Sequence, residues 1–386
     1  PREQGWLMIK VENLLKTFQT PRGEVRAVDD VSFEVPSGEL CILLGPSGCG
    51  KTTTLKMVNR LVPHTSGKIY IDGRDTDEYD LIQLRRNIGY VIQQIGLFPN
   101  MTVEQNIAVV PKMLGWTSQQ IKDRARELVN MVALDESMLE RYPKELSGGQ
   151  QQRVGLARGL AGDPPVLLMD EPFGAIDPIN REVIQDEFLK MQQDLKKTIL
   201  FVSHDIDEAV KMGDKIAIFR GGKLVQYDAP DELLAHPKND FVADFVGGDR
   251  ELKRMRLIKV RQAMEPTRAS AYASDSLADA KKRLDQAGGD HLVVLDADDR
   301  PQGQLARDDL ESADAKRTCE EEQHPLAAPV AMLHDLRTAV SRMFTYNTDW
   351  LAVVDEDGRY AGTISNQSIT DHLHSARKKG RQRETA

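Results

Sequence analysis

The sequence predicts an α/β fold with a parallel sheet, followed by a smaller duplicated module. Before residue 246, short apolar runs suited to buried strands recur, and several end directly in glycines or polar residues. One run leads through a glycine-rich loop into a stretch that can continue as a helix. Beyond residue 246 the sequence changes character and then repeats itself. Parallel α/β sheets present functional residues at the carboxyl ends of their strands, so we expect the site there.

The glycine-rich loop lies between the apolar run 39–44 and the helix-compatible stretch 52–58. It has the spacing Gly-x4-Gly-Lys-Thr and comprises Gly45, Pro46, Ser47, Gly48, Cys49, Gly50, Lys51, Thr52 and Thr53. Glycines let backbone N–H groups converge on phosphate oxygens, and the helix N-terminus adds partial positive charge. Lys51 can then reach the outer phosphates, and the Thr52 hydroxyl can ligate Mg²⁺. A plain glycine-rich turn is the alternative, but the Lys-Thr pair favours a phosphate loop that binds ATP.

A pair of carboxylates follows a second apolar strand, 165–169. Asp170 is placed to hold a magnesium shell, and Glu171 to orient and polarise an attacking water. Such acidic pairs at strand ends also occur as structural ion pairs. Beside a phosphate loop, the catalytic interpretation is the better one.

Three single residues and a second glycine-rich turn accompany these motifs. Gln93 ends a β-like run, where its amide could reach the metal or the water, and His204 follows a third buried strand at 198–203. Taken alone, His204 would pass as a satisfied polar group and Asp177 as a turn residue. The second turn comprises Leu146, Ser147, Gly148, Gly149 and Gln150. Each of these residues is a weak signal alone, but their order along the chain, together with the two motifs above, points to a common site.

In that order, residues from about 8 to 246 resemble the nucleotide-binding subunit of an ABC transporter. The resemblance identifies a Walker A loop, Q-loop Gln93, a signature motif at 146–150, a Walker B strand at 166–170, catalytic Glu171, D-loop Asp177 and switch His204. It implies a P-loop NTPase fold with a RecA-like core and a helical subdomain. Phe18 stands where this family places an aromatic ring that stacks on adenine, although a lone Phe is more often a core residue.

The family mechanism implies a homodimer of ATPase subunits and the cofactors ATP and Mg²⁺. Two subunits meet head to tail, so that Ser147 and the backbone of Gly148 and Gly149 face the γ-phosphate held by the other copy's Lys51. Hydrolysis, with Glu171 as base and His204 holding the γ-phosphate, removes charge-assisted contacts across the interface. The implied catalytic residues are Glu171, His204, Lys51 and Gln93, and the implied metal ligands are Thr52, Gln93 and Asp170.

Composition is consistent with an ATPase that drives another polypeptide. Apolar runs are far shorter than the roughly 18 residues of a membrane helix, so we expect the pore to be a separate chain, and no apolar signal sequence is visible. The net charge of −9 argues against a generic nucleic-acid or anionic-lipid binder. Cys41, Cys49 and Cys319 form no disulfide framework or metal spacing, which suits a reducing cytosol.

An internal repeat with a spacing of 59 positions, as from Leu277 to Leu336, occupies the C-terminal part. The other matched pairs are Ala280 with Ala339, Leu292 with Leu351, Val294 with Val353, Asp296 with Asp355, Asp298 with Asp357, and Gly303 with Gly362. An ungapped register of this kind indicates duplication. Each copy reads as a helix, a strand, an acidic turn and a second strand.

The tandem copies resemble a CBS pair of βαββα-like repeats, a regulatory module that often binds adenine nucleotides. Ligand-binding copies often carry a hydroxyl three positions after the glycine and an Asp six positions after it. The first copy has Ala306 and Asp309 there, and the second has Ser365 and Ser368. Because each copy keeps half of the pattern, regulation by a nucleotide ligand and a purely structural dimerisation role both stay open.

We predict four segments: an ABC nucleotide-binding domain at 1–246, a linker at 247–261, a tandem CBS domain at 262–375 and a basic tail at 376–386. The tail is expected to be a solubilising end, with contact to the anionic cytoplasmic leaflet as the alternative. The whole arrangement resembles the ATPases of importers for glycine betaine, carnitine, choline or proline. The local sequences of residues 85–102 and 106–112 closely match those of this group of ATPases.

The resemblance implies integral membrane permease subunits, which would contact a segment from Gln93 to about Pro111, and an extracytoplasmic solute-binding protein. It implies a peripheral location at the cytoplasmic face of the bacterial inner membrane. The alternatives are an importer ATPase for an amino acid, a sugar or a metal, an ABC ATPase of DNA repair or translation, and a nucleotide sensor. The chain has one ATPase half and no sustained heptads, which argues against a DNA-repair or translation ATPase. The presence of both Glu171 and His204 argues against a nucleotide sensor.

Overall fold

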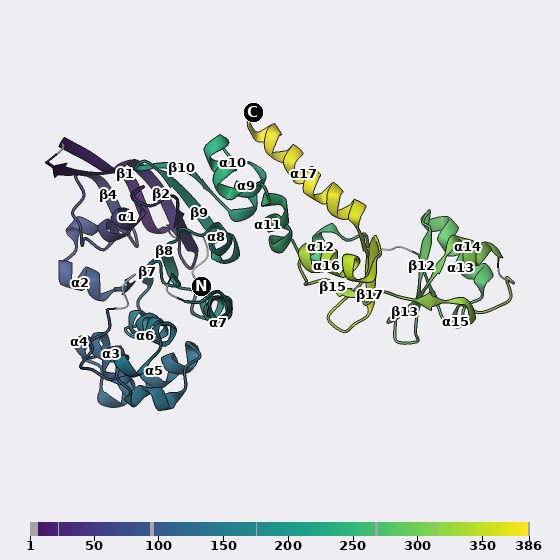
Figure 1. Cartoon of the computed structure of the whole chain (residues 1–386), viewed down its shortest axis with the longest axis horizontal. Helices are drawn as coiled ribbons and strands as arrows, with labels where there is room; N and C mark the ends of the chain where they lie inside the picture. Colours follow the sequence, from purple (N-terminus) through teal and green to yellow (C-terminus); the bar gives the residue numbers. More distant parts are fainter. Residues whose placement is uncertain are drawn as a thin grey trace. The chain divides into compact units, whose positions relative to one another are not determined.

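The computed structural model describes residues 7–21, 23–92, 96–174, 176–266, 269–312 and 314–384 (Figure 1). The chain divides into two compact units. The first comprises Pro1–Leu233 and Pro237–Val246, and the second comprises Leu234–His236 and Gly247–Ala386.

A six-stranded sheet forms the centre of the first unit, in the order β10-β9-β3-β8-β7-β6. Its strands are β3 (Leu40–Leu44), β6 (Ile88–Val91), β7 (Val166–Asp170), β8 (Thr198–Val202), β9 (Lys215–Arg220) and β10 (Lys223–Asp228). All neighbouring strands are parallel except β10, which runs antiparallel to β9. Because β3, β7 and β8 are buried along their whole length, they read as continuous apolar runs, and the predicted α/β sheet is confirmed.

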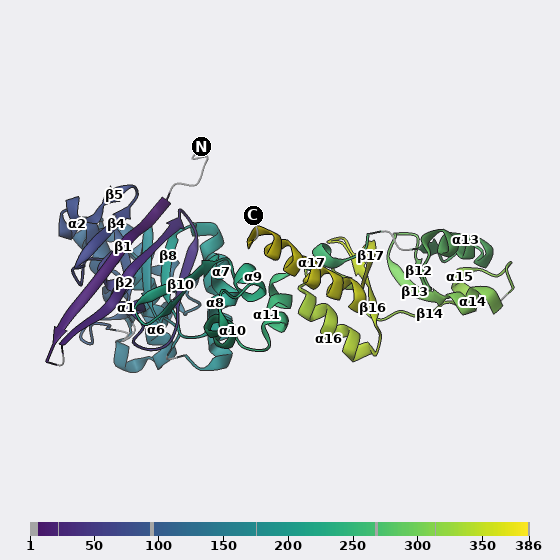
Figure 2. The same cartoon turned by 90° about the horizontal axis from the view of Figure 1, so that it is seen from above.

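An antiparallel sheet covers one side of this core in the order β2-β1-β4-β5. Its strands are β1 (Leu7–Thr20), β2 (Gly23–Pro36), β4 (Ser66–Ile71) and β5 (Arg74–Asp75). Figure 2 shows β1 and β2 as two long neighbouring strands. Apolar residues of both sheets and of the helix after the glycine-rich loop, such as Val31, Leu168 and Leu55, share one buried cluster. The loop is thereby anchored at both of its ends.

The helices up to residue 246 fall into two groups. The strand-to-strand connections and the end of the unit contain α1 (Lys51–Val58), η1 (Thr76–Glu78), α2 (Leu81–Arg86), α7 (Pro178–Leu195), α8 (Ile206–Met212), α9 (Pro230–Ala235) and α10 (Asp240–Val246). The second group lies together at one end of the unit (Figure 1) and contains α3 (Val103–Ile107), α4 (Val109–Met113), α5 (Ser118–Met131), η2 (Glu136–Glu140), η3 (Pro143–Glu145) and α6 (Gly148–Leu160). This second group is the predicted helical subdomain.

The second unit contains the two copies of the repeat. The first copy is built from β11 (Ser270–Tyr272), α13 (Leu277–Ala287), β12 (His291–Leu295), β13 (Pro301–Ala306), α14 (Arg307–Ser312), α15 (Cys319–Glu322) and β14 (His324–Pro325). The second copy is built from β15 (Val330–Ala331), α16 (Leu336–Tyr346), β16 (Trp350–Val354), β17 (Tyr360–Ser365) and α17 (Asn366–Glu384).

The duplication is visible in the strand register. Val294 pairs with Gly303 in the first copy, and Val353 pairs with Gly362 at the equivalent place in the second. In both copies a register shift follows that pair. The two copies meet through a buried apolar cluster to which each contributes strand residues, namely Val293, Leu295, Trp350 and Ala352.

The stretch predicted as a linker, 247–261, has regular structure. It contains α11 (Arg250–Leu257) and the start of α12 (Val260–Ala263). Ile258 and Val260 are buried in the core of the second copy, together with Leu336 and Ile364. The sequence interpretation gave weight to the basic residues, whereas the apolar residues between them determine the packing.

Among the described residues, no helix combines the length and the apolar character that a membrane crossing requires. The three cysteines, Cys41, Cys49 and Cys319, are buried and unpaired with one another.

Candidate functional site

Two glycines shape the loop between β3 and α1. Gly45 has φ 146° and Gly50 has φ 105°, a backbone region that side chains disfavour. A Cβ added at Gly45 would lie 2.3 Å from the carbonyl oxygen of Phe219, and one at Gly50 would lie 2.4 Å from that of Ala27. Only glycine fits at these two positions, so the loop can pass this close to its neighbouring strands.

Lys51 is the first residue of α1 and is only 6% exposed. Its Nζ donates hydrogen bonds to the carbonyl oxygens of Gly45, at 2.6 Å, and Pro46, at 2.9 Å. The ammonium group is therefore folded back over the glycine-rich loop. A buried charge held by backbone carbonyls is available to an anion that enters the loop.

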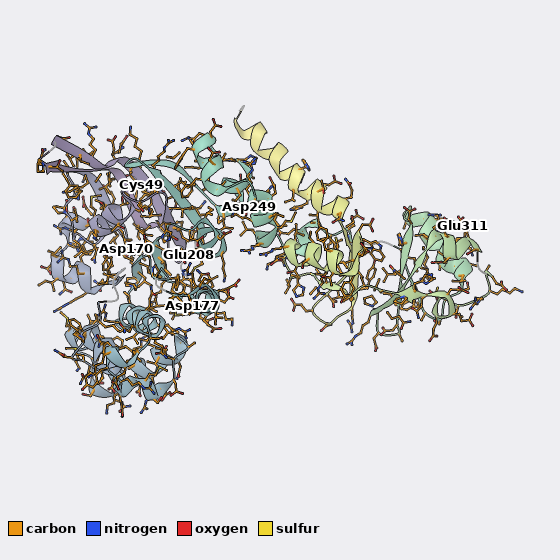
Figure 3. The ribbon with its side chains drawn as sticks, in the orientation of Figure 1. Cys49, Asp170, Asp177, Glu208, Asp249 and Glu311 are labelled. Carbon is orange, nitrogen blue, oxygen red and sulfur yellow. The ribbon has the colours of Figure 1, made fainter. Side chains whose placement is uncertain are left out.

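Thr52 and Asp170 are brought together from positions far apart in the chain. The Thr52 hydroxyl donates to Asp170 Oδ1 at 2.9 Å. Asp170, labelled in Figure 3, ends β7. It is only 4% exposed. Burial raises the pKa of Asp170, and the bond from Thr52 and the charge of Lys56 only partly oppose that rise. An adjacent hydroxyl and buried carboxylate are oxygen ligands suited to Mg²⁺, and a cation there would favour the ionised carboxylate.

Glu171 follows Asp170 in a left-handed conformation, with φ 47°. Its N–H donates to the carbonyl oxygen of Val202 in β8 at 3.0 Å, which holds the turn against the neighbouring strand. Glu171 Oε1 lies 3.6 Å from His204 Nδ1, and the His204 side chain is 62% exposed. Strained backbone of this kind at a strand end is common in functional sites. The ends of β7 and β8 thus place the predicted base beside the predicted switch histidine.

The predicted signature motif lies at the N-terminus of α6. Ser147 caps this helix: its Oγ accepts from the Gln150 N–H, and the Gln150 side chain accepts from the Ser147 N–H at 2.9 Å. Leu146 is buried, and Ser147 and Gly148 are exposed. The first N–H groups of a helix have no acceptor within it. The motif therefore presents backbone donors and the positive end of a helix dipole to solvent.

Of the remaining predicted residues, the structure describes Asp177 and Phe18. Asp177 is exposed immediately before α7. Phe18 lies in β1 and is 40% exposed, with the Lys16 ammonium 4.9 Å from its ring centroid. An exposed ring can offer a stacking face, which a core residue cannot. Gln93 lies outside the described residues.

A groove of about 370 Å³ lies between the central sheet and the helical subdomain. Arg85, Arg86, Phe98, Val110 and Arg158 are among the residues that line it. Arg158 Nη1 donates to the carbonyl oxygen of Gly96 at 2.7 Å. The groove thus combines cationic groups with an exposed aromatic ring.

A second cleft, of about 470 Å³, lies between the two repeat copies. His291 and Gln304 line it from the first copy, and Asn347, Asp349 and Trp350 are among the residues that line it from the second. The His291 and Trp350 rings are 5.6 Å apart. Aromatic and polar side chains around a cleft suit a flat, polar ligand.

The residues of the incomplete CBS pattern form hydrogen bonds within their own copies of the repeat. Asp309 accepts from the Ala306 N–H at 2.7 Å, and its Oδ1 lies 3.1 Å from His324 Nε2. In the second copy, Ser365 and Ser368 bond to each other, each side-chain oxygen accepting from the other residue's N–H at 3.1 Å.

The sequence analysis missed one buried acidic residue near the site. Glu208, labelled in Figure 3, lies in α8. It accepts hydrogen bonds from Ser203 and Gln185. The available signal was a Glu directly before the apolar residues Ala209 and Val210, on the buried face of a helix that follows the predicted switch histidine.

Comparison with known proteins identifies the family. A family model described as ABC transporter matches residues 28–174, and a CBS domain model matches residues 330–375. The "Osmoprotectant import ATP-binding protein OsmV" of Salmonella typhimurium is 55% identical over 96% of this chain and 97% of its own length. The "Glycine betaine/carnitine/choline transport ATP-binding protein OpuCA" of Bacillus subtilis is 42% identical over 96% of this chain and 97% of its own length.

Among solved structures, the dimeric ATP-binding cassette MJ0796 bound to ADP and Pi is similar to the first unit. Its TM-score is 0.54 at 34% sequence identity, covering 57% of this chain and 98% of that chain. The fold, the motif geometry and the full-length relatives lead to one assignment. The chain belongs to the family of ATP-binding, ATP-hydrolysing subunits of ABC transporters, with a CBS domain at its C-terminal end.

Proposed function

We propose that this chain powers the uptake of quaternary ammonium compatible solutes, the class of glycine betaine, carnitine, choline and proline, through separate membrane subunits. The observation that carries the proposal is the 55% identity, over nearly the whole length of both chains, to a protein named as an osmoprotectant import ATP-binding protein. An extracytoplasmic binding protein and a permease would select the solute, because the site found in this chain is built for phosphate groups.

The first unit carries the hydrolytic chemistry. Lys51 and the loop N–H groups bind and orient the phosphates of ATP. Thr52 and Asp170, with Gln93, would hold Mg²⁺, which when bound neutralises charge on the phosphate oxygens. Glu171 accepts a proton from the attacking water, and His204 holds the γ-phosphate. The 3.6 Å separation of Glu171 and His204 supports roles at the same phosphate.

The signature motif completes a site in a second copy of the chain. Its Ser147 hydroxyl and the N–H groups of Gly148 and Gly149 would meet the γ-phosphate bound at the partner's loop. The exposure of Ser147 and Gly148 at a helix N-terminus supports this role, since such a terminus attracts anions. Asp177, exposed directly before α7, would lie at the same interface. A homodimer with two ATP sites follows.

The groove beside the helical subdomain is the proposed contact with the membrane subunits. It includes Phe98 and Val110 from the segment expected to couple ATP hydrolysis to transport, and its arginines favour an acidic loop in the partner. The chain would then be a peripheral protein at the cytoplasmic face of the inner membrane, recruited by its permease.

The second unit is proposed to regulate uptake. The cleft between its copies is open and lined by His291 and Trp350, which suits stacking of an adenine ring. By the family pattern, Asp309 and Ser365 would be the sugar and phosphate contacts, each from one copy, once they give up their bonds within those copies. We place the catalytic domain at 1–246, the connecting segment at 247–261, the CBS pair at 262–375 and the basic tail at 376–386.

Uptake of labelled glycine betaine after a salt upshift tests the proposal, in cells that lack their own osmolyte transporters and carry this subunit with its native partners. We expect uptake with the wild-type chain and none with Glu171→Gln, which should also lower ATP hydrolysis by about 100-fold or more, as loss of general base catalysis does, and prolong the ATP-bound dimer. Glu187→Gln, which removes a half-exposed charge of α7 that pairs with Lys190, is the matched control and should transport normally.

Two outcomes would overturn parts of the proposal. Hydrolysis at the ordinary steady-state rate by Glu171→Gln would remove Glu171 as the base. Intact hydrolysis by the wild-type complex without uptake of betaine would leave the transporter assignment standing and move the search to amino acids, sugars or metals.

A further inference from the structure

We propose that Glu208 is a positioning residue for the switch histidine, whose buried carboxylate ties the loop carrying His204 to helix α7, the helix that follows Asp177. The inference rests on the proposed role of His204. It adds a buried residue that acts through the backbone on both sides of His204.

The contacts of Glu208 join two elements. The Ser203 hydroxyl donates to Glu208 Oε2 at 2.5 Å, and the Gln185 amide of α7 donates to Glu208 Oε1 at 2.9 Å. Glu208 is 9% exposed, and Ser203 and Gln185 are buried. Each carboxylate oxygen therefore has one defined donor, one from the end of β8 and one from the helix beside it.

The Ser203 hydroxyl that donates to Glu208 also bonds to the residue after His204. Ser203 Oγ accepts from the Asp205 N–H at 3.0 Å, so the residues before and after His204 are joined by a single side chain. Asp205 in turn caps α8, accepting from the N–H groups of Asp207 and Glu208. The His204 ring is largely exposed, and its direction is set by this backbone because neighbouring side chains enclose so little of it.

A second contact runs in parallel at the start of α7. Arg181 Nη2 donates to the carbonyl oxygen of Ile176 at 2.8 Å, and its Nη1 lies 3.9 Å from Asp205 Oδ2. The Arg181 N–H donates to the carbonyl oxygen of Asp177. Arg181 thus joins the Asp177 turn to Asp205, and Gln185, one helical turn later, joins α7 to Glu208. Two successive turns of α7 hold the switch loop.

A buried carboxylate is a costly way to fill this space. Burial raises the pKa of Glu208, the nearby Asp205 raises it further, and the bonds from Ser203 and Gln185 with the charge of Arg181 oppose the rise. Packing alone would be served as well by an apolar side chain. What an apolar side chain cannot do is accept from Ser203 and Gln185 at once, and this double acceptance fixes the switch loop relative to α7.

Steady-state ATP hydrolysis by the full-length chain tests the inference, with Glu208→Gln, Glu208→Ala and Glu187→Gln, the last being a charge removal on α7 away from this network. Glu208→Gln keeps the size and one acceptor oxygen but turns the other oxygen into an NH2 donor, so the side chain can no longer accept from both Ser203 and Gln185. We expect kcat to fall about tenfold, within the range for a displaced catalytic group, with unchanged KM for ATP and an unchanged melting temperature. Glu208→Ala should lower kcat further, and Glu187→Gln should leave it unchanged.

A double-mutant cycle separates positioning from general damage. If Glu208 acts through His204, adding Glu208→Gln to His204→Ala should lower kcat no further than His204→Ala alone. Multiplying effects in the double variant, or a kcat for Glu208→Gln within twofold of wild type, would overturn the inference while leaving the ATPase assignment intact. A His204→Ala chain with the wild-type rate would instead refute the proposed role of His204, and the inference with it.

Discussion

The polar side chains at the expected ligand positions have different surroundings in the two units. In the first unit, Lys51, Asp170 and Glu208 are buried and held by hydrogen bonds at the carboxyl ends of parallel strands or just beyond them. In the second unit, two polar residues at the family positions, Asp309 and Ser365, are half-buried, Ser368 is buried, and all three bond within their own copies. Buried charges are expensive unless they are held. The first unit is therefore already organised for chemistry, whereas the second would have to exchange existing bonds for those of a ligand.

The largest change in ATP hydrolysis is expected from variants that remove either the phosphate loop or the signature motif of the first unit. Ser147→Arg should lower hydrolysis about 100-fold, comparable to the loss of a preorganised phosphate contact, and leave ATP binding by the loop intact. Lys51→Ala should also be inactive.

Mixing the two inactive chains provides the decisive measurement. One site of a mixed dimer would combine an intact loop from the Ser147→Arg chain with an intact signature from the Lys51→Ala chain. Recovery of hydrolysis on mixing is expected, and no recovery despite formation of mixed dimers would rule out a head-to-tail shared site. Mixing two Lys51→Ala preparations is the control.

A smaller effect is expected from removing the second unit. A chain ending at Val246 should hydrolyse ATP within about twofold of the full-length rate, since compact domains with separate cores can fold alone, but should lose regulation of uptake. A cut after Arg261 would retain Ile258 and Val260 without the core that buries them, and should give a less soluble protein. Loss of ATP binding in the shorter chain would contradict the domain boundary.

The smallest effect concerns Asp309. Partial burial raises its pKa, but the bonds from Ala306 and His324 outweigh burial and hold the pKa below the ordinary value. A lowered pKa in the folded state contributes stability that is present above the unfolded value of about 3.9 and is lost as pH falls through the folded value. Because the pair is partly exposed, the contribution should be about 0.5 kcal/mol.

Thermal unfolding of the full chain between pH 7 and pH 3 measures this contribution. Asp309→Asn should flatten the pH dependence of the transition of the second unit, and Asp308→Asn, exposed on the same helix, should not. Equal pH dependence in wild type and Asp309→Asn would show that the surface pair contributes nothing, which would strengthen the contrast between the units.

The sequence predicted the parts of the site that depend on spacing along the chain. The loop from Gly45 to Thr53 and the pair Asp170-Glu171 were predictable because a parallel sheet requires functional residues directly after its strands. The register of the repeat was predictable for a similar reason, since duplicated segments pair in the same way. Glu208 could not be identified, because its partners Ser203 and Gln185 come together only when α7 packs beside α8. The helices in 247–261 were missed because the many basic residues suggested a solvent-exposed segment. The sequence did not show that Ile258 and Val260 pack into the core of the second copy.

The cap of α6 has a consequence for what the signature serine can do. A hydroxyl has one hydrogen to donate and two lone pairs that accept, and Ser147 Oγ already accepts from the Gln150 N–H. Its hydrogen is left to point outward from the helix start, so the cap sets the polarity of the hydroxyl before any anion arrives. An Asp there would cap the helix equally well, but it would meet a phosphate with negative charge. The helix cap thus admits several residue types, but only a residue that can donate while it caps would also suit the proposed phosphate contact with a second copy.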